Sequence, residues 1–126
     1  MPNLENKEQT GHRLLRSYRI RQNRDYRRIY RSGKRFSNRA GLLYVTRVKS
    51  GDIRIGFVTT KKIGHAVDRN RARRLMKEVY RFHRAELSPN YEAIMLAGSF
   101  LTTATYKEAE KAVLALWRKA GILVQS

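Results

Sequence analysis

The chain has 126 residues, and its 28 Lys and Arg against 10 Asp and Glu give a formal net charge of +18. This length holds one domain, and with 41% hydrophobic residues and no cysteine the composition excludes a disordered basic tail, a disulfide framework and thiol chemistry. Because no apolar run has the length of a signal peptide or a membrane span, we expect a cytoplasmic protein with no membrane partner.

The first structured element is predicted to be a short helix. Residues 1–17 are polar and aperiodic, so we expect a flexible extension there. Asn23 then stands at the position of an N-cap, and Tyr26 and Tyr30 recur at helical spacing on one face. Gly33 is predicted to end this helix.

Two strands are predicted to follow. Residues 36–48 alternate, which places Leu42 and Tyr44 together on one face of a strand. Residues 53–60 are rich in β-branched residues and follow a turn at residues 50–52. We expect the two strands to pair as an antiparallel hairpin.

The most regular segment of the chain is predicted to be a helix from Ala66 to about Glu86, with a buried and a basic face. The predicted apolar stripe consists of Leu75, Phe82, Val79, Ala72, His83 and Met76. The opposite face carries six cations and one amide: Arg69, Arg73, Arg84, Lys77, Asn70, Arg81 and Arg74.

A short buried strand over residues 91–97 and a last helix complete the prediction. Thr105 and Glu108 match a capping box at the start of this helix, and Gly121 is placed to end it. The predicted order is helix, two or three strands, helix, strand, helix, which is α-β-β-β-α-β-α with three strands. This order indicates an α/β two-layer sandwich with helices on a mixed sheet of about four strands.

These elements assign residues 18–122 to a single domain, followed by a tail at residues 123–126.

The positive charge of the whole chain is not spread evenly along the sequence. Lys and Arg minus Asp and Glu is 14 − 3 = +11 for residues 1–50, 10 − 4 = +6 for residues 51–90 and 4 − 3 = +1 for residues 91–126. A surface charged only for solubility would not leave the last segment nearly neutral, so we predict a one-sided site for a polyanion, with nucleic acid favoured over an anionic membrane.

The sequence shows no self-sufficient active site. None of His12, His65 and His83 has a carboxylate placed nearby in sequence to orient it, which favours structural roles. The acidic residues are scattered, without the pairing typical of a metal site. We therefore predict no catalytic residue, no metal site and no cofactor of the protein's own.

The basic helix suits a phosphate chain, because its neighbouring cations are about 5 to 6 Å apart. Arginine predominates, and its planar fork can grip phosphate with two hydrogen bonds. Asn70 is either a plain surface residue or one that orients an arginine or contacts a base edge or 2′-hydroxyl. Lys61 and Lys62 precede the helix N-terminus, whose free amides add to an anion site.

The tyrosines allow two interpretations. Tyr26, Tyr30 and Tyr44 could be ordinary core residues, or they could form a platform on which unpaired bases stack. The arginines around them in the sequence favour stacking: Arg24, Arg27, Arg28, Arg31 and Arg39.

Residues 61–81 (KKIGHAVDRNRARRLMKEVYR) closely resemble the RNR signature of bacterial ribonuclease P protein subunits. Residues 23–30 resemble the family's first helix with its paired aromatics, residues 37–44 its first strand, and residues 91–120 its last strand and helix. Tyr26 and Tyr30 stand where the family commonly has phenylalanine, and Lys77 where it often has arginine. The resemblance spans about residues 18–120.

The resemblance implies a small basic cofactor of a catalytic RNA, in an enzyme that removes the 5′ leader from precursor tRNA. Hydrolysis would then belong to metal ions held by the RNA, so that Mg²⁺ enters only through the RNA subunit, and the protein would be monomeric within the ribonucleoprotein. The family fold also implies a left-handed crossover between parallel strands. The alternative is a ribosomal or other structural RNA-binding protein, and a DNA-binding or membrane-surface protein comes third.

The resemblance also implies two sets of binding residues. The expected contacts to the RNA subunit are Lys61, Lys62, Arg69, Asn70, Arg71, Arg73, Arg74, Lys77 and Arg81. The expected contacts to the precursor leader are Tyr26, Tyr30, Leu42 and Tyr44.

Overall fold

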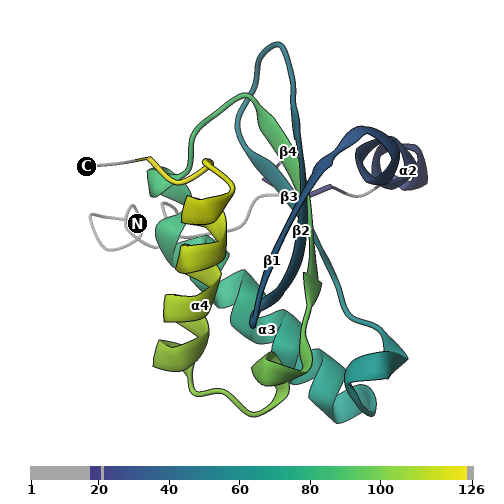
Figure 1. The fold of residues 1–126 in the computed structure, drawn as a ribbon, viewed down its shortest axis with the longest axis vertical. Coiled ribbons are helices and arrows are strands. Elements are labelled where there is room, and N and C mark those ends of the chain that lie inside the picture. The colour runs from purple at the N-terminus through teal and green to yellow at the C-terminus, as the bar shows by residue number, and fades with distance from the viewer. Residues whose placement is uncertain (1–17, 21, 125–126) are drawn as a thin grey trace, which may run out of the picture.

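The computed structural model describes residues 18–20 and 22–124. With the labels of Figure 1, its elements in chain order are α2 (Asn23–Ser32), β1 (Lys34–Asn38), β2 (Gly41–Arg47), β3 (Arg54–Val58), α3 (Ala66–His83), β4 (Tyr91–Ala97) and α4 (Tyr106–Lys119). The predicted element order is confirmed. The predicted extension at residues 1–17 and the last two residues of the predicted tail lie outside the described residues.

The four strands form one mixed sheet in the order β1-β2-β4-β3. The β1–β2 and β2–β4 pairs are antiparallel, whereas β3 and β4 are parallel. Helices α3 and α4 cover one face of the sheet, and α2 lies on the other (Figure 1). The predicted α/β architecture with a mixed four-stranded sheet is thus confirmed.

The single strand expected over residues 36–48 is wrong, because the chain reverses at Arg39–Ala40 and forms the β1–β2 hairpin. The backbone N–H of Ala40 donates to Asn38 Oδ1 (2.8 Å) within this turn. Gly41 follows with φ 142°, and a Cβ there would lie 1.9 Å from the carbonyl oxygen of Leu96. Arg39 and Ala40 are not typical turn residues, so the alternation of apolar residues conceals the reversal.

The hairpin expected between the strand around Tyr44 and residues 53–60 is also wrong. The neighbours of β2 are β1 and β4, and β3 pairs only with β4 among the strands. Residues 92–95 of β4 are all buried, so this strand needs a neighbour on each edge. Its parallel partner β3 is reached through α3, as in the crossover that the family resemblance implies.

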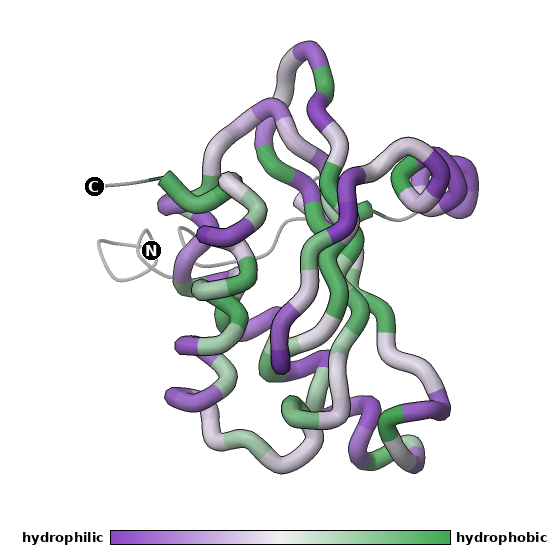
Figure 2. The backbone as a smooth tube through the Cα atoms, in the orientation of Figure 1, coloured by the Kyte–Doolittle hydropathy of each residue, from purple (hydrophilic) through white to green (hydrophobic). Residues whose placement is uncertain are grey.

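The main core lies between the sheet and the helices α3 and α4, where Figure 2 shows the hydrophobic positions facing one another. Tyr80 and Trp117 are its largest fully buried side chains, and their rings meet edge to face at 6.3 Å. The hydroxyl of Tyr80 donates to the carbonyls of Tyr18 (2.7 Å) and Ile53 (3.2 Å). The predicted apolar stripe omits Tyr80 and includes Phe82, which is 45% exposed.

Helix boundaries follow local capping signals. Thr105 and Glu108 form the predicted capping box of α4, and Gly121 follows the end of this helix with φ 80°. Helix α3 begins at the predicted Ala66. The N-cap of α2 is Gln22, whose side chain makes no capping hydrogen bond. The predicted N-cap, Asn23, is therefore one residue too late.

None of the helices in the described part of the chain combines the length and hydropathy needed to cross a bilayer.

His83 lies at the end of α3 between two carboxylates. Its Nδ1 is 2.8 Å from Glu86 Oε2, and its Nε2 is 2.6 Å from Glu110 Oε2. The expectation that no nearby carboxylate orients this histidine is therefore wrong, because Glu86 is three residues along the chain. Burial by itself lowers the pKa of His83, but the hydrogen bonds to Glu110 and Glu86 outweigh it, and the pKa lies above its usual value.

We expect His83→Gln to destabilise the protein more at about pH 6 than at about pH 8.5. Because the folded-state pKa is raised, the imidazolium stabilises the fold fully below the unfolded-state pKa of about 6.5. This contribution is lost as the pH rises through the folded-state pKa. Urea unfolding of both proteins across this pH range measures the difference, and a destabilisation independent of pH would contradict the role of the charged form.

Candidate nucleic-acid interface

Helix α3 carries a row of polar side chains, which we call the basic helix surface. Its members, with one acidic residue among them, line one hollow on the outside of the helix: Asn70, Arg73, Arg74, Lys77, Glu78 and Arg81. Nη1 of Arg73 donates to Asn70 Oδ1 (3.1 Å), and Nη2 donates to Thr59 Oγ1 (2.6 Å). Of the two interpretations of Asn70, the structure supports the one in which it orients a neighbouring arginine.

The loop before α3 adds a second hollow beside the basic helix surface, lined by Lys61, Lys62, His65 and Arg69 among others. Arg69 Nη1 donates to the carbonyl of Gly64 (3.0 Å), which ties this loop to the helix. The backbone N–H of His65 donates to Asp68 Oδ2 (3.0 Å). Lys61 and Lys62 are exposed, as a contact to a polyanion requires.

Arg71, an expected contact to the RNA subunit, and Arg84, expected on the cationic face, make other contacts. Arg71 donates from Nε to the carbonyl of Thr102 (3.1 Å) and from Nη2 to the carbonyl of Ala104. These two hydrogen bonds join α3 to the segment before α4. Arg84 lies over the ring of Tyr18, with 3.1 Å from its Cζ to the ring centroid, and pairs with Asp52. The contact of Arg71 with RNA stays a prediction, while its carbonyl partners give it a structural role.

The four residues expected to hold a single strand lie on the sheet face opposite α3 and α4, and we call them the aromatic surface: Tyr26, Tyr30, Leu42 and Tyr44. The ring of Tyr30 meets Tyr26 at 6.5 Å and the edge of Tyr44 at 5.0 Å between centroids. In β2, alternation places Leu42 and Tyr44 on one face of the strand, as expected from the sequence, and Tyr44 packs against the small cluster that α2 contributes to.

The structure supports the core interpretation of these rings in part, and their stacking on bases stays a prediction. Tyr26 and Tyr44 are half-buried against a small cluster that contains Ile29 and Ile94, whereas Tyr30 is 38% exposed. Burial raises the pKa of Tyr26, and burial together with the two neighbouring tyrosines raises the pKa of Tyr30. A tyrosine hydroxyl is neutral near pH 7 at its ordinary pKa, and these upward shifts keep both hydroxyls neutral.

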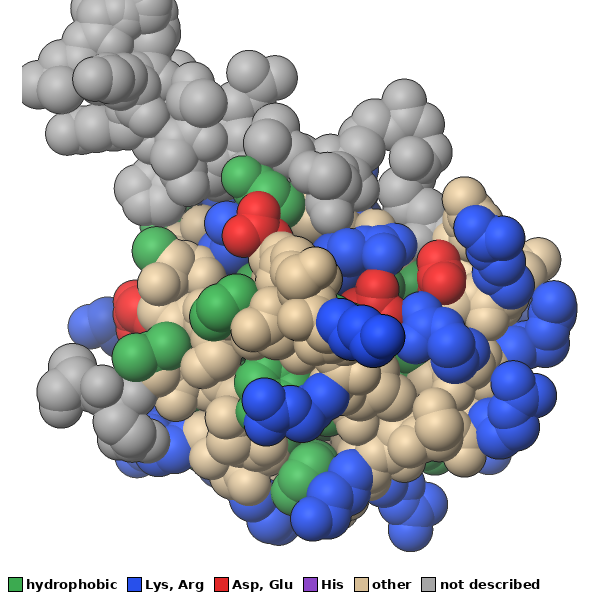
Figure 3. Space-filling model, turned by 90° about the horizontal axis from the view of Figure 1, so that it is seen from above, with side chains coloured by type: hydrophobic (Ala, Val, Ile, Leu, Met, Phe, Trp, Pro, Cys, Tyr) green, Lys and Arg blue, Asp and Glu red, His purple; other side chains and the backbone are tan. Residues whose placement is uncertain are grey.

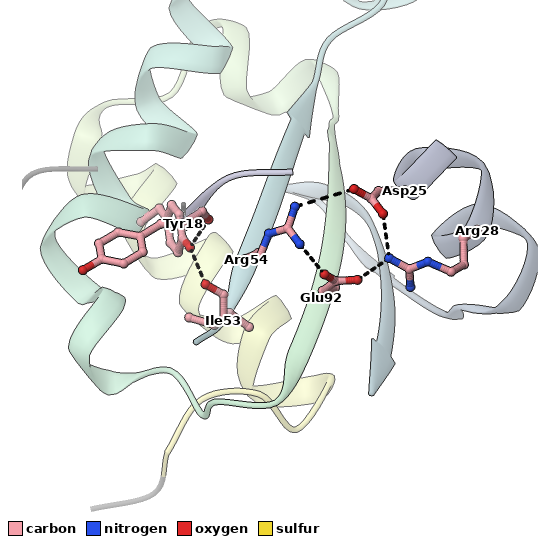
Figure 4. A network of polar contacts seen from close by, with 7 residues as sticks. Tyr18, Asp25, Arg28, Ile53, Arg54 and Glu92 are labelled. Atoms are coloured by element: carbon pink, nitrogen blue, oxygen red, sulfur yellow. Dashed lines mark hydrogen bonds and ion pairs between the residues drawn. The ribbon is translucent and has the colours of Figure 1, made fainter. Parts of the chain in front are cut away.

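A buried carboxylate fixes α2 to the sheet. Glu92, on β4, is 6% exposed and accepts hydrogen bonds from Arg28 (2.5 Å) and Arg54 (2.7 Å). Asp25 of α2 pairs with the same two arginines at 3.0 and 3.6 Å (Figure 4). This network is absent from the sequence prediction, although a glutamate inside the apolar run of β4 is a signal for buried ion pairing.

The molecule seen from above carries Lys and Arg over much of its surface, with few Asp and Glu between them (Figure 3). In residues 18–20 and 22–124, no three His, Asp or Glu side chains are grouped to hold a metal ion. The absence of a metal site from the whole protein stays a prediction. What the described surface offers near α2 and α3 is a set of cations beside partly exposed rings, which can bind a nucleic acid.

Comparisons with known proteins give a consistent result. The family model described as Ribonuclease P matches residues 14–121. Proteins named Ribonuclease P protein component match from Clostridium botulinum (strain Langeland / NCTC 10281 / Type F), 37% identical over 86% of this chain and 98% of that protein, and from Clostridioides difficile (strain 630), 34% identical over 83% and 93%.

Solved structures agree in fold. The RNase P protein of Staphylococcus aureus superposes with a TM-score of 0.77 and 27% identity, over 86% of this chain and 99% of that chain. The RNase P protein from Thermotoga maritima gives a TM-score of 0.72 at 21% identity, over 80% and 96% of the two chains, and is similar in fold alone.

Proposed function

The chain belongs to the ribonuclease P protein family, and from this premise we propose that it holds both RNAs of the tRNA-maturing enzyme. The basic helix surface, with the loop at Lys61 and Lys62, binds the catalytic RNA subunit. The aromatic surface binds the single-stranded 5′ leader of precursor tRNA. The family assignment confirms the resemblance and disfavours the alternative of a ribosomal protein with no role in tRNA processing.

The observation that carries this proposal is the continuity of the two surfaces. Tyr26 of the aromatic surface and Lys77 of the basic helix surface line one hollow, together with Gly56 of β3. A strand of RNA can therefore pass from stacked bases to cationic side chains without leaving the protein. Neutral rings bind any base face, whereas arginine forks grip phosphate, so the two surfaces suit the two parts of a nucleotide chain.

The protein's part in the reaction is binding and orientation. The protein holds the leader, which lies on one side of the scissile bond, against the RNA subunit. The reacting groups are then held in a fixed geometry instead of meeting by diffusion. Mg²⁺ held by the RNA subunit would supply the hydrolytic chemistry. The protein side chains that we assign here all bind or position RNA.

The double variant Arg73→Gln and Arg74→Gln tests the basic helix surface. Gln keeps an unbranched polar side chain, although a shorter one than Arg, and removes two charges. We expect weaker binding of a bacterial ribonuclease P RNA, and a slope of log K against log salt that falls by about one for each phosphate that the protein no longer neutralises. Binding titrations at several KCl concentrations measure both quantities.

The matched control is Lys107→Gln with Lys111→Gln, which removes two exposed charges of α4 outside both surfaces. This control lowers the net charge by the same amount. The slope of log K against log salt for the control therefore reports the effect of the protein's overall charge on RNA binding. If both double variants lose the same affinity and slope, the RNA subunit does not bind α3 specifically.

A further inference from the structure

Residues 60–65, which we call the basic loop, enter α3 through a glycine. The basic loop carries Lys61 and Lys62, and both side chains are exposed. Gly64 has φ 144°, a backbone conformation that favours glycine. Its carbonyl accepts a hydrogen bond from Nη1 of Arg69 (3.0 Å). The course of the basic loop ahead of α3 therefore depends on the contacts around Gly64.

Asp68, in the first turn of α3, makes two contacts with the end of the basic loop. Its Oδ2 accepts the backbone N–H of His65 (3.0 Å). Its carboxylate also lies against Gly64, where an added Cβ would be 2.5 Å from Oδ2. Asp68 does not line the hollow that the basic loop forms. Its side chain thus holds the loop without belonging to the surface that the loop presents.

The charge of Asp68 opposes the binding of a polyanion. The side chain is half-buried, and in the part of the chain that the structure describes no ion pair includes it. Its negative charge repels the phosphates that Lys61 and Lys62 attract. The charge and the loop contacts of Asp68 therefore act on RNA binding with opposite signs, so that experiment can separate them.

We propose that Asp68 is a positioning residue for the binding of the RNA subunit. Its carboxylate holds the N–H of His65 and packs against Gly64, and it thereby keeps Lys61 and Lys62 in the arrangement that contacts RNA. A loop that is fixed before binding loses less conformational entropy on binding. This inference rests on the proposed function, in which the basic loop binds the catalytic RNA.

The test measures the affinity of the full-length protein for a bacterial ribonuclease P RNA at fixed KCl and Mg²⁺ concentrations. Asp68→Ala removes one negative charge together with the acceptor for His65. We expect this variant to bind RNA about fivefold more weakly, the equivalent of one capping hydrogen bond, although the protein becomes more positive. Asp68→Asn removes the same charge but keeps an oxygen acceptor, so it should bind at least as tightly as the wild type.

Glu108→Ala on α4 is the matched control. Asp68 and Glu108 are each the third residue of their helix, and Glu108 Oε1 accepts the backbone N–H of Thr105 (2.9 Å). This variant removes an equal charge and an equivalent cap outside both surfaces. It should bind RNA within about twofold of the wild type or more tightly. Urea unfolding checks that the two alanine variants lose similar stability.

Two results would overturn the role of Asp68. Affinity in Asp68→Ala equal to that of Glu108→Ala, or above that of the wild type, would mean that the contacts with the basic loop do not affect RNA binding. Equal weakening in Asp68→Ala and Asp68→Asn would assign the effect to the lost charge and not to the hydrogen bond.

The double variant Lys61→Gln and Lys62→Gln separates failure of this inference from failure of the proposed function. If the double variant keeps wild-type affinity, the basic loop does not bind the RNA subunit and both fail. If it weakens binding but Asp68→Ala does not, only the positioning by Asp68 is wrong. If Asp68 acts through these lysines, adding Asp68→Ala to the double variant should weaken binding by less than about twofold more, as a double-mutant cycle detects.

Discussion

Replacing Glu92 with glutamine will lower the free energy of unfolding by about 2 to 3 kcal/mol. The carboxylate is 6% exposed and accepts from Arg28 and Arg54. A glutamine keeps the volume but leaves two guanidinium groups facing a neutral amide. Both arginine side chains are about a third exposed, at 40% and 32%, so solvent moderates the loss compared with a fully buried pair. Urea unfolding at neutral pH measures the change.

An exposed pair on α3 provides the control for this prediction. Arg81 and Glu78 form an i, i+3 ion pair with both side chains 36% exposed. Glu78→Gln should cost less than about 1 kcal/mol, because an exposed pair gains little over solvation by water. If Glu78→Gln and Glu92→Gln destabilise the protein equally, burial does not distinguish the two carboxylates and the anchoring role of Glu92 is wrong.

Glu92→Gln also has a selective functional consequence. Helix α2 carries Tyr26 and Tyr30, and Glu92 binds this helix to the sheet through Arg28. We therefore expect the variant to lose part of its preference for precursor over mature tRNA, while its affinity for the RNA subunit through α3 stays close to that of the wild type. A general loss of folded protein would lower both affinities together.

Elements with local signals are the ones that the sequence predicts. The capping box of Thr105 and Glu108 and the start of α3 at Ala66 are correct, because neighbours in the chain determine them. The sheet order is different. Strand β4 is buried on both faces and therefore pairs with β2 on one edge and β3 on the other. The paired residues are 38 to 56 positions apart in the chain, and no local pattern contains such pairs.

In the candidate site, too, the sequence predicts what local patterns determine and misses what distant residues determine. Alternation along β2 places Tyr44 on the correct face, and helical periodicity gathers Arg73 and Arg74 on one surface. A helical wheel assigns a direction to each cation but not a partner. Arg71 and Arg84 therefore count as available charges in the sequence, whereas in the fold they bind carbonyls and a tyrosine ring. Tertiary contacts alone separate cations that hold the protein together from those left for RNA.

Tyr44→Leu will weaken the binding of precursor tRNA by about 1 to 3 kcal/mol, or roughly 5- to 150-fold, and that of mature tRNA far less. Tyr44 is half-buried on β2, with its ring against the edge of Tyr30 at 5.0 Å. Leucine fills part of the same space but has no π face on which a base can stack. Equilibrium binding of both tRNAs to the reconstituted holoenzyme measures the two losses.

Tyr44→Phe separates the ring from its hydroxyl. Because stacking depends on the ring, this variant should keep nearly all of the preference for precursor tRNA. The free energy of unfolding of both variants must be measured in parallel, since Tyr44 also packs against the cluster of Ile29 and Ile94. Equal losses for precursor and mature tRNA in Tyr44→Leu, with the fold intact, would mean that the leader does not lie on the aromatic surface. A loss confined to precursor tRNA and absent from Tyr44→Phe would place an unpaired base on this ring.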